Sequence, residues 1–515
     1  MSIQCLNSEN LYYSFLSGAQ EVIRNKRILN EINVFPVSDG DTGSNLASTM
    51  ISIIEEAKIF STVKETMNSI ADAALNGARG NSGIIIAQYI NGIFMSIHND
   101  DNLTMNSFAD MVKDAVPHAY QAITNPVEGT IITVIKDWAD AIDRHKNDSE
   151  DFQSLLSTSM GHAEKSLHDT TMQLKVLQDS NVVDSGAKGF VCFLQGFTNF
   201  LKTGSFVTDR DLNQEIISFA EYPDHNQEDI HERYCTEALI SGTDIDLEDI
   251  KRQLSPLGDS LIVAGNKGKA KIHIHTNSPE MIFQTLKEMG TIIQQKADDM
   301  VRQNESAYQR KYTTALVTDS IADLPKDYMD RFQIHMLPLN LVFENTTYLD
   351  KVTMTPEIFY PLLDKAEEYP TSAQPSPREV EKFLGTVLTH YDEVIVITVS
   401  AEQSGTNSLF NKAVEKLAQA GKKITVINSK QNSLAEGLLV LRAAELIEEG
   451  IPYEEVVETI ESLRVNTEIL VSVNTLKYMV RSGRVSKVTG FAGSLVNLKP
   501  VITNDPNGKG GIATM

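Results

Sequence analysis

Three features are scarce in this sequence of 515 residues: cysteine, positive charge and long apolar runs. The three cysteines, Cys5, Cys192 and Cys235, lie far apart, and an odd number this small does not build a disulfide framework. A reducing compartment is therefore expected, because disulfides persist mainly in oxidising ones. The longest apolar stretch, residues 84–95, is interrupted by two polar amides and is shorter than the about 20 residues that span a bilayer, so no transmembrane segment is expected.

Positive charge is the second shortage, since 45 basic residues stand against 69 acidic ones and the net charge is −24. Such a chain repels phosphate backbones, and nucleic-acid binding depends on neutralising phosphates with Lys and Arg, so no nucleic-acid partner is expected. An anionic nucleotide must then be held by metal ions or by a local nest of backbone amides. The first residues lack a basic segment followed by an apolar run, so no signal peptide is expected and a cytoplasmic location is predicted.

The spacing of apolar residues predicts three domains. Residues 1–205 place apolar side chains three and four apart in segment after segment, which is typical of an all-helical bundle. Residues 206–311 contain two strand-like runs around a turn at residues 266–268, flanked by helical segments, and predict a small α+β domain that ends in a linker helix. Residues 312–515 alternate short runs rich in Val and Ile with helical segments, which predicts a doubly wound α/β domain.

Four runs of the third domain are predicted to be buried parallel strands, at residues 313–320, 392–400, 422–429 and 468–474. Ligands bind at the carboxyl ends of the strands in such sheets. The rim formed by these ends is predicted to hold Asp319 and Ser320, the stretch Ser400 to Thr406, and Asn428 and Ser429.

An acidic loop with glycines at residues 33–45, NVFPVSDGDTGSN, is the most informative segment of the chain. Asp39 and Asp41 offer two hard oxygen ligands separated by one residue, in a turn that Gly40 and Gly43 make sterically possible. Mg²⁺ usually binds one or two carboxylates together with substrate phosphates. On spacing alone, an ordinary Asp-Gly turn explains the loop equally well. The groups that could cradle a phosphate ahead of the next helix belong to Thr42, Ser44 and Asn45.

This loop resembles the NVFPVPDGDTGTNM signature of DhaL-like kinase domains, which occur in dihydroxyacetone kinases and fatty acid kinases. Three further segments resemble the family's motifs in the family's order. Residues 77–83 match GARGNSG, residues 126–134 (PVEGTIITV) resemble PVEGTILTV, and residues 182–189 (VVDSGAKG) resemble VVDAGGQG. The resemblance implies an α-helical barrel that binds ATP or ADP at one end. Mg²⁺ would bridge the phosphates to Asp39 and Asp41, the two residues expected to be catalytic.

The same resemblance implies further contacts around the nucleotide. Dihydroxyacetone-type relatives carry one more aspartate upstream, and Asn33 stands in its place as a third Mg²⁺ ligand. Phosphoryl transfer depends on positioning and charge neutralisation more than on covalent chemistry. The other residues implied to bind the nucleotide are Thr42, Gly43, Ser44, Asn45, Asn81, Ser82, Gly83, Gly129, Thr130, Asp184 and Gly186.

A second cluster combines Cys235 with His273 and His275. The two histidines alternate in the run KAKIHIHT, so their imidazoles project from one face of a strand. One thiolate and two imidazoles suit Zn²⁺ and leave a fourth position open. From the residues alone, a solvated strand face and a buried thiol are the better explanation. The segments YCTE, GDSLIVAG and KIHIHTNSP, however, resemble the middle domain of fatty acid kinase catalytic subunits, which favours a metal site whose role, catalytic or architectural, stays open.

The last domain carries a third resemblance. Residues 317–325, VTDSIADLP, are similar to the opening of DegV-like proteins, which bind one fatty acid in a buried tunnel, and the similarity continues at residues 372–377 and 476–500. A tunnel gains about 0.8 kcal/mol for each buried CH₂, whereas the carboxyl group needs hydrogen bonds. Helix caps and turns are the alternative explanation for the hydroxyl groups involved. The residues implied to contact the acid are Thr371, Ser372, Ser404, Gly405, Thr406 and Arg484. Because DegV-like proteins continue beyond the position that corresponds to Met515, a truncated or incomplete domain is expected.

Taken together, these segments predict a fatty acid kinase fused to a DegV-like carrier, in which ATP and a fatty acid give ADP and an acyl phosphate for phospholipid synthesis. A separate DegV-like carrier, an acyl-phosphate acyltransferase and a second copy of the chain in a homodimer are the further expected partners. Phosphorylation of a small ketose such as dihydroxyacetone is one alternative, although the domain with a covalent-hemiaminal histidine is not seen. The other alternative is a non-catalytic, nucleotide-gated protein with a lipid-binding or regulatory role.

Overall fold

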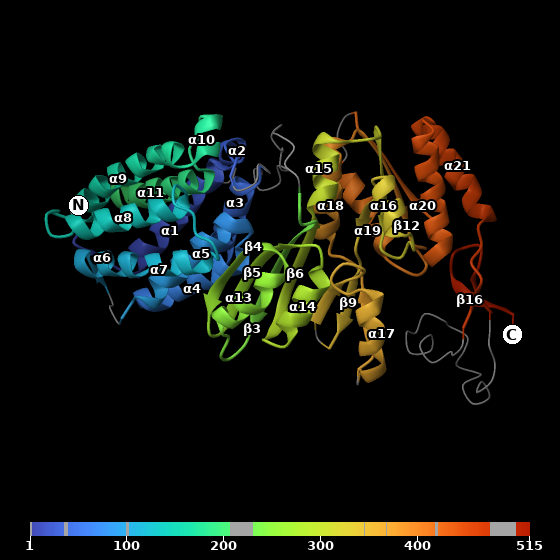
Figure 1. The fold of residues 1–515 in the computed structure, drawn as a ribbon, viewed down its shortest axis with the longest axis horizontal. Coiled ribbons are helices and arrows are strands. Elements are labelled where there is room, and N and C mark those ends of the chain that lie inside the picture. The colour runs from blue at the N-terminus through green and yellow to red at the C-terminus, as the bar shows by residue number, and fades with distance from the viewer. Residues whose placement is uncertain are drawn as a thin grey trace. The chain divides into compact units, whose positions relative to one another are not determined.

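The computed structural model describes residues 3–35, 40–98, 102–206, 230–344, 346–366, 368–417, 421–473 and 501–514. Two compact units divide the chain, residues 1–298 and residues 299–515 (Figure 1). Asp39, Arg484 and the segment 476–500, which carry three of the predictions above, lie outside the described residues.

The first unit opens with helices, as predicted for residues 1–205. The only strands in the described part of this stretch are β1 (Cys5–Leu6) and β2 (Leu103–Thr104), which pair antiparallel. None of the helices among the described residues has the length and apolar character needed to cross a bilayer. The helix bounds are α1 Ser8–Arg24, α2 Lys26–Glu31, α3 Thr42–Glu56, α4 Val63–Gly77, α5 Gly80–Met95, α6 Met105–Asp114, α7 Val116–Ala122, α8 Ile131–His145, α9 Phe152–Gln173, α10 Lys175–Ser180 and α11 Ser185–Thr203.

Local side chains set where these helices begin. Thr62 accepts the N–H of Glu65 at the start of α4, and Asp151 forms a reciprocal capping box with Ser154 at the start of α9. Each cap satisfies an N–H group that has no acceptor within its own helix. The apolar faces of α1, α8, α9 and α11 then pack side by side (Figure 1).

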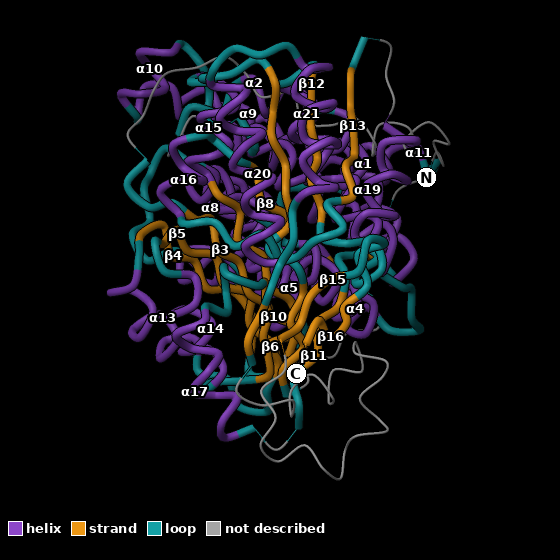
Figure 2. Tube along the Cα trace, turned by 90° about the vertical axis from the view of Figure 1, so that its right-hand side faces the viewer, coloured by secondary structure: helices purple, strands orange, loops and turns teal. Residues whose placement is uncertain are grey.

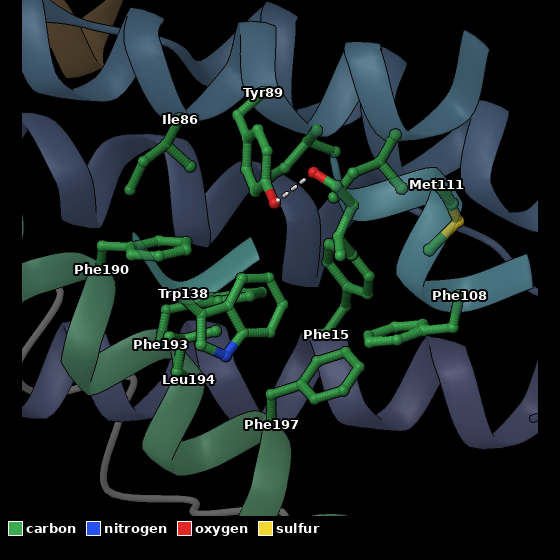
Figure 3. A pocket seen from close by; sticks show the side chains of 13 residues that line it. Phe15, Ile86, Tyr89, Phe108, Met111, Trp138, Phe190, Phe193, Leu194 and Phe197 are labelled. Atoms are coloured by element: carbon green, nitrogen blue, oxygen red, sulfur yellow. Dashed lines mark hydrogen bonds between the residues drawn. The ribbon is translucent and has the colours of Figure 1, made fainter. Parts of the chain in front are cut away.

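An aromatic cluster fills the centre of the helical part and surrounds a small cavity of about 30 Å³ with a wholly apolar lining (Figure 3). Trp138 meets Phe190 and Phe108 edge to face, with ring centroids 5.8 Å and 6.4 Å apart. Tyr89 donates its hydroxyl to the carbonyl oxygen of Val112 at 3.1 Å, so the buried phenol is satisfied. An apolar space of this size is expected to stay dry.

Replacing Trp138 by Ala is expected to lower the free energy of unfolding by about 3–5 kcal/mol, because the side chain is 4% exposed and its loss enlarges the existing cavity. Urea denaturation followed by circular dichroism measures the change. Met172→Ala, at a position 71% exposed, is the matched control and is expected to change stability by less than about 0.5 kcal/mol. Equal stability of the Trp138→Ala variant and the parent would contradict the central role of this cluster.

The first unit ends in a four-stranded sheet of order β4-β5-β3-β6, in which β3, β4 and β5 run side by side (Figure 2). The predicted turn at residues 266–268 is confirmed, because β4 and β5 pair antiparallel on either side of it. The bounds are β3 Tyr234–Ser241, α13 Leu247–Leu254, the 3₁₀ turn Ser255–Leu257, β4 Asp259–Asn266, β5 Lys269–Thr276, α14 Pro279–Lys287 and β6 Thr291–Asp299.

Two amide side chains of α5, which interrupt the apolar run 84–95, form hydrogen bonds with this sheet. Gln88 accepts the N–H of Gly265 at 2.7 Å, and Asn91 donates to the carbonyl oxygen of the same glycine at 3.0 Å. Gly265 is required here, because a Cβ atom would lie 2.1 Å from the carbonyl oxygen of Lys269. The polar interruptions that weigh against a membrane span therefore join strand β4 to the helical part.

The second unit contains the predicted doubly wound α/β fold. Its main sheet is parallel, with the order β13-β12-β7-β8, and Leu316, Ile395 and Ile427 pack with α20 and α21 on one face while α18 and α19 also contact the sheet. The bounds are α15 Met300–Tyr308, β7 Thr314–Asp319, α16 Lys326–Arg331, β8 His335–Leu337, β9 Asn340–Phe343, β10 Thr346–Leu349, α17 Pro356–Lys365, β11 Thr371–Ala373, α18 Pro377–His390, β12 Glu393–Thr398, α19 Thr406–Leu417, β13 Lys423–Asn428, α20 Ser433–Glu448, α21 Tyr453–Asn466, β14 Val471–Ser472, β15 Val501–Asn504 and β16 Gly510–Thr514.

Three of the four predicted parallel strands are confirmed, and the prediction for residues 468–474 is wrong. Only Val471 and Ser472 form a strand there, and they pair antiparallel with β15 in a separate sheet of order β14-β15-β16. Leu470 is 62% exposed, so the run does not enter the core that its apolar residues suggested. The fourth parallel strand is the short β8, which was not predicted because a three-residue strand with a histidine carries little apolar signal.

The expected linker helix is α15, and it packs within the second unit. Arg302 is 6% exposed and donates to the carbonyl oxygen of Met329 at 2.9 Å and to Asp330 at 3.0 Å. The boundary at residue 311 stays a prediction.

Candidate nucleotide, metal and lipid sites

The N-termini of α3, α5, α8 and α11 meet at one end of the helical part. A Cβ atom on Gly80 in α5 would lie 2.1 Å from Nδ2 of Asn45 in α3, and one on Gly186 in α11 would lie 2.9 Å from Oγ of Ser82 in α5. The latter Cβ would also lie 3.3 Å from Ile131, the first residue of α8. Each helix N-terminus carries N–H groups without intrahelical partners and a partial positive charge, so this arrangement suits an anion such as a phosphate.

Asn30 and Asn33 hold the loop that leads into α3. Asn30 accepts the N–H of Ser44 at 3.0 Å and donates to its hydroxyl at 3.1 Å, while Thr42 donates to the amide oxygen of Asn33 at 2.7 Å. The hydroxyl groups expected to contact a phosphate thus also anchor the turn. Magnesium coordination by Asn33 would have to use the second lone pair of its amide oxygen. Asn30 was not predicted, since its only signal is a polar residue buried in a short helix.

Asp41 lies at the N-cap of α3, at the edge of this cluster of helix starts. The preceding Gly40 has a φ of 62°, a left-handed conformation that glycine adopts without a steric penalty. A Cβ atom on Gly43 would lie 2.2 Å from the carbonyl oxygen of Lys26, so α3 can approach the start of α2 only with glycine at this position. The pairing of Asp41 with Asp39 stays a prediction, because Asp39 lies outside the described residues.

Asp184 joins the starts of α8 and α11. Its carboxylate accepts the N–H of Ala187 at 2.8 Å and that of Ile131. Burial raises the pKa of Asp184 to about 6, although the two N–H groups act in the opposite direction. Thr130 is the N-cap residue of α8 and donates its hydroxyl to the carbonyl oxygen of Val127 at 2.8 Å. Asp184 and Thr130 therefore position the helix N-termini that are predicted to bind the nucleotide.

The remaining predicted nucleotide contacts include two glycines at close approaches. A Cβ atom on Gly83 would lie 2.7 Å from Oγ1 of Thr49, and one on Gly129, where φ is 84°, would lie 2.8 Å from Cβ of Gln173. The amide oxygen of Asn81 is buried and has no hydrogen-bond partner among the described residues. Buried polar atoms are nearly always satisfied, and an amide oxygen only accepts, so its partner would be a hydrogen-bond donor or a cation at the first turn of α5.

Cys235, His273 and His275 come together on one face of the middle sheet, as predicted. Their potential ligand atoms lie within 4.8 Å of one another, and Sγ of Cys235 is 3.8 Å from Nδ1 of His273. Tetrahedral Zn²⁺ with these ligands requires separations of about 3.3–3.8 Å, so small side-chain movements suffice. His273 is 3% exposed and its Nε2 has no partner within the described residues. The residues therefore fit a zinc ion, and no other group of three or more Cys, His, Asp or Glu side chains in the described ranges is as close.

Glu237, which the sequence did not single out, links this sheet to α5. It is 2% exposed and accepts the N–H of Gly80 at 3.0 Å, while Nδ1 of His273 lies 3.8 Å from the same carboxylate oxygen. Burial would raise the pKa of Glu237, yet Lys296 and Lys271 hold it well below its usual range. One ionised carboxylate thus lies between the candidate metal ligands and the first turn of α5.

The predicted rim of the second unit is confirmed. Asp319 accepts the N–H of Val399 at 2.9 Å, and Asn428 accepts the N–H of Ala401 at 3.1 Å, so the ends of β7, β12 and β13 are joined by hydrogen bonds. Ser404 and Thr406 exchange a hydrogen bond of 2.8 Å beside this rim.

Two of the segments expected to bind the acid lie next to each other. A Cβ atom on Gly405 would lie 2.1 Å from Oε1 of Gln374, which brings the Ser404-Gly405-Thr406 turn against the segment after β11. Thr371 and Ser372 are exposed on β11, and Thr406 is fully buried. Arg484 is outside the described residues, so this part of the lipid-contact prediction is not placed.

A buried pair of acids lies behind the rim. Asp319 and Glu436 are both 0% exposed, and the oxygens of Glu436 have no hydrogen-bond partner among the described residues. Burial raises the pKa of Asp319 to about 6, and burial together with the neighbouring Asp319 raises that of Glu436 well above its usual range. The folded protein therefore binds protons more tightly here than the unfolded chain does.

Stability is accordingly expected to fall as the pH rises from about 4, where free carboxyl groups ionise, through 6, where Asp319 ionises in the folded state. Glu436→Gln is expected to raise the free energy of unfolding at pH 7.5 by about 1–3 kcal/mol and to flatten this dependence, because the new amide can donate to Asp319. Thermal melts of the full chain between pH 4 and 8 check both effects. Glu445→Gln, on the exposed side of α20, is the control and is expected to leave the profile unchanged; an unchanged profile for Glu436→Gln would contradict the pairing.

Comparison with known families adds three matches in succession. The DAK2 domain matches residues 36–199, the FakA-like middle domain of fatty acid kinase matches residues 231–307, and the DegV family COG1307, described as uncharacterised, matches residues 313–512. The chain is therefore a multidomain protein with these domains in this order.

Curated relatives match about three fifths of the chain. An uncharacterized protein of Staphylococcus haemolyticus (strain JCSC1435) is 33% identical over 319 residues, which is 60% of this chain and 58% of the relative. One of Staphylococcus aureus (strain bovine RF122 / ET3-1) is 33% identical over 324 residues, 61% of this chain and 59% of the relative. The chain thus spans less than two thirds of the length of these relatives.

Solved DegV structures are similar to part of the chain. A DegV family protein from Thermus thermophilus, described by its fatty acid binding, shows 33% identity over 39% of this chain and 70% of its own, with a TM-score of 0.36. DegV from Bacillus subtilis, described as a fatty acid binding protein, shows 32% identity over 40% and 72%, also with a TM-score of 0.36.

Proposed function

We propose, from a chain that joins a DAK2 domain, a FakA-like middle domain of fatty acid kinase and a DegV domain, that this protein phosphorylates fatty acids with ATP. The products would be ADP and an acyl phosphate. The DegV domain would carry the acid on the same chain as the kinase, and a short flexible tether raises the effective concentration of a bound substrate to about the millimolar range.

The observation that carries the proposal is the meeting of four helix N-termini, one of which has Asp41 as its N-cap. In a protein with a net charge of −24, a triphosphate cannot rely on a general positive field. First-turn N–H groups and helix dipoles supply the missing attraction locally. The glycines at the close approaches bring the backbone amides of different helices together, which is what a polyphosphate chain needs.

The residues of this site would bind and orient the nucleotide. Asn30, Asn33 and Asp184 hold the helix starts in place, and the amides of α5 face the phosphates. Asp41, with Asp39 beside it in sequence, would hold Mg²⁺, which supplies charge neutralisation to the phosphoryl groups when bound. Cys235, His273 and His275 would hold Zn²⁺, which acts as a Lewis acid or as a structural tie when bound.

Further parts of the proposal concern the whole protein in the cell. A cytoplasmic location agrees with the low cysteine content. A homodimer, a separate DegV-like carrier and an acyltransferase that consumes the acyl phosphate complete the proposed setting.

The decisive experiment incubates the full chain with MgATP and oleate and traps the acyl phosphate with hydroxylamine. Acyl hydroxamate that appears only with all components supports the proposal. Oleate that co-purifies with the chain without any hydroxamate favours a nucleotide-gated binding protein, and phosphorylation of dihydroxyacetone instead of oleate favours a ketose kinase. Either result overturns the fatty acid kinase assignment.

A further inference from the structure

A cluster of cations lies between the start of α5 and the middle sheet. Lys271 on β5 is 4% exposed, Lys296 on β6 is about three quarters buried, and Arg79 is the N-cap residue of α5. The N–H of Gly80, the residue after Arg79, donates to Glu237 at 3.0 Å, and Nζ of both lysines lies within 4.0 Å of the same carboxylate, so the start of α5 adjoins the lysines. Three positive charges are thus gathered in a protein whose overall charge is strongly negative.

Among the described residues, two carboxylates balance these cations. Glu237 lies 3.4 Å from Nζ of Lys271 and 4.0 Å from Nζ of Lys296, and Asp298 lies 2.7 Å from Lys296. No acidic side chain in the described parts of the chain lies within 4.0 Å of the Arg79 guanidinium. The cluster therefore carries one uncompensated positive charge, and buried or half-buried charges are costly unless an opposite charge accompanies them.

The position of this excess charge identifies the kind of ligand. Arg79 directly precedes the first turn of α5, whose N–H groups have no acceptors within the helix; of these, the N–H of Gly80 is already bonded to Glu237. On the side of the sheet, Nδ1 of His273 lies 3.8 Å from Glu237, so the candidate metal ligands adjoin the same carboxylate. A planar guanidinium beside backbone amides matches the geometry of a carboxylate or phosphate group, which both can bind through two oxygens.

We propose that Arg79, supported by Lys271 and Lys296, forms an oxyanion site at the junction of α5 and the middle sheet. The site would hold either the terminal phosphoryl group of the nucleotide or the carboxylate of the acceptor acid. This inference rests on the proposed function and adds to it the residues that receive the reacting groups. It also explains why the middle domain adjoins the first turn of α5 through Glu237, since Glu237 holds both lysines beside Arg79.

Calorimetry on the full chain separates the two sources of the oxyanion. The probes are MgADP, the magnesium complex of a non-hydrolysable ATP analogue, and decanoate as a soluble carboxylate. Arg79→Met is expected to leave MgADP affinity within about twofold and to weaken one of the other two probes by about ten- to a hundredfold. A loss for the ATP analogue assigns the site to the terminal phosphoryl group, and a loss for decanoate assigns it to the acceptor.

Matched variants keep the test sharp. Lys269→Met removes a cation from the same face of β5, but Lys269 is already bonded to Asn76 and lies 3.8 Å from Asp72, so it is expected to bind all three probes normally. Arg79→Lys is expected to bind the affected probe more tightly than Arg79→Met but more weakly than the parent, because lysine keeps the positive charge and lacks the planar guanidinium. Lys271→Met repeats the test should Arg79→Met melt well below the parent.

The site is refuted if Arg79→Met and Lys271→Met, both folded, bind the ATP analogue and decanoate as the parent does. It is equally refuted if MgADP affinity falls by the same factor as that of the analogue, since Arg79 would then touch the inner phosphates. Failure of the proposed function looks different: the parent itself would bind no nucleotide in magnesium buffer. In that case, stabilisation of the parent by inorganic phosphate or decanoate, lost in Arg79→Met, would still support the oxyanion site.

Discussion

Asp41→Asn is expected to lower ATP-dependent acyl phosphate formation by about a thousandfold, the size of effect seen when a group that stabilises charge in a transition state is removed. Asp41 lies at the N-cap of α3, where the starts of three other helices converge. Removing its charge would weaken the hold on Mg²⁺, and the phosphoryl groups would then keep their full repulsion. The hydroxamate assay at saturating ATP measures the loss, and excess Mg²⁺ is expected to restore part of it.

Asp246→Asn is the matched control for this variant. Asp246 is also an aspartate at a helix N-cap, but its carboxylate accepts the N–H groups of Glu248 and Asp249 at the start of α13. The same change of charge there is expected to leave turnover within about twofold and to cost at most about 1 kcal/mol of stability. Turnover retained by Asp41→Asn, or lost equally in both variants, would remove Asp41 from the metal site.

Cys235→Ser is expected to reduce the zinc content of the purified chain from about one ion to almost none, because a site with two imidazoles and a weak hydroxyl ligand loses most of its affinity. The cysteine and both histidines already lie within 4.8 Å of one another, so the site needs little rearrangement to accept the metal. Elemental analysis after dialysis against a mild chelator gives the stoichiometry directly.

Cys5→Ser is the control for the zinc measurement, since Cys5 is exposed and remote in sequence from the cluster. It is expected to retain the metal in full. His273→Ala is expected to behave like Cys235→Ser, because the two side chains are 3.8 Å apart across neighbouring strands. Zinc that stays bound to both variants would show that the metal lies elsewhere.

Local patterns in the sequence predicted much of the fold. Helical spacing, a turn between two strand-like runs and buried runs of Val and Ile predicted the three kinds of fold, and the glycines of the acidic loop occupy close approaches and a left-handed turn. The run at residues 468–474 misled because apolar content alone does not reveal which partner a strand pairs with. Val471 and Ser472 of this run pair antiparallel with β15 and do not enter the main parallel sheet.

The sequence by itself determined the order of the domains, most of the secondary structure and the chemical types of the candidate ligands, since each of these follows from neighbouring residues. Only the tertiary structure decided which side chains meet. Gly80 and Glu237 are separated by 157 positions, and Asn91 and Gly265 by 174, yet each pair shares a hydrogen bond of 3.0 Å. The balance of charge around Arg79 depends on such distant contacts, because electrostatic attraction is set by distance in space and not by distance along the chain.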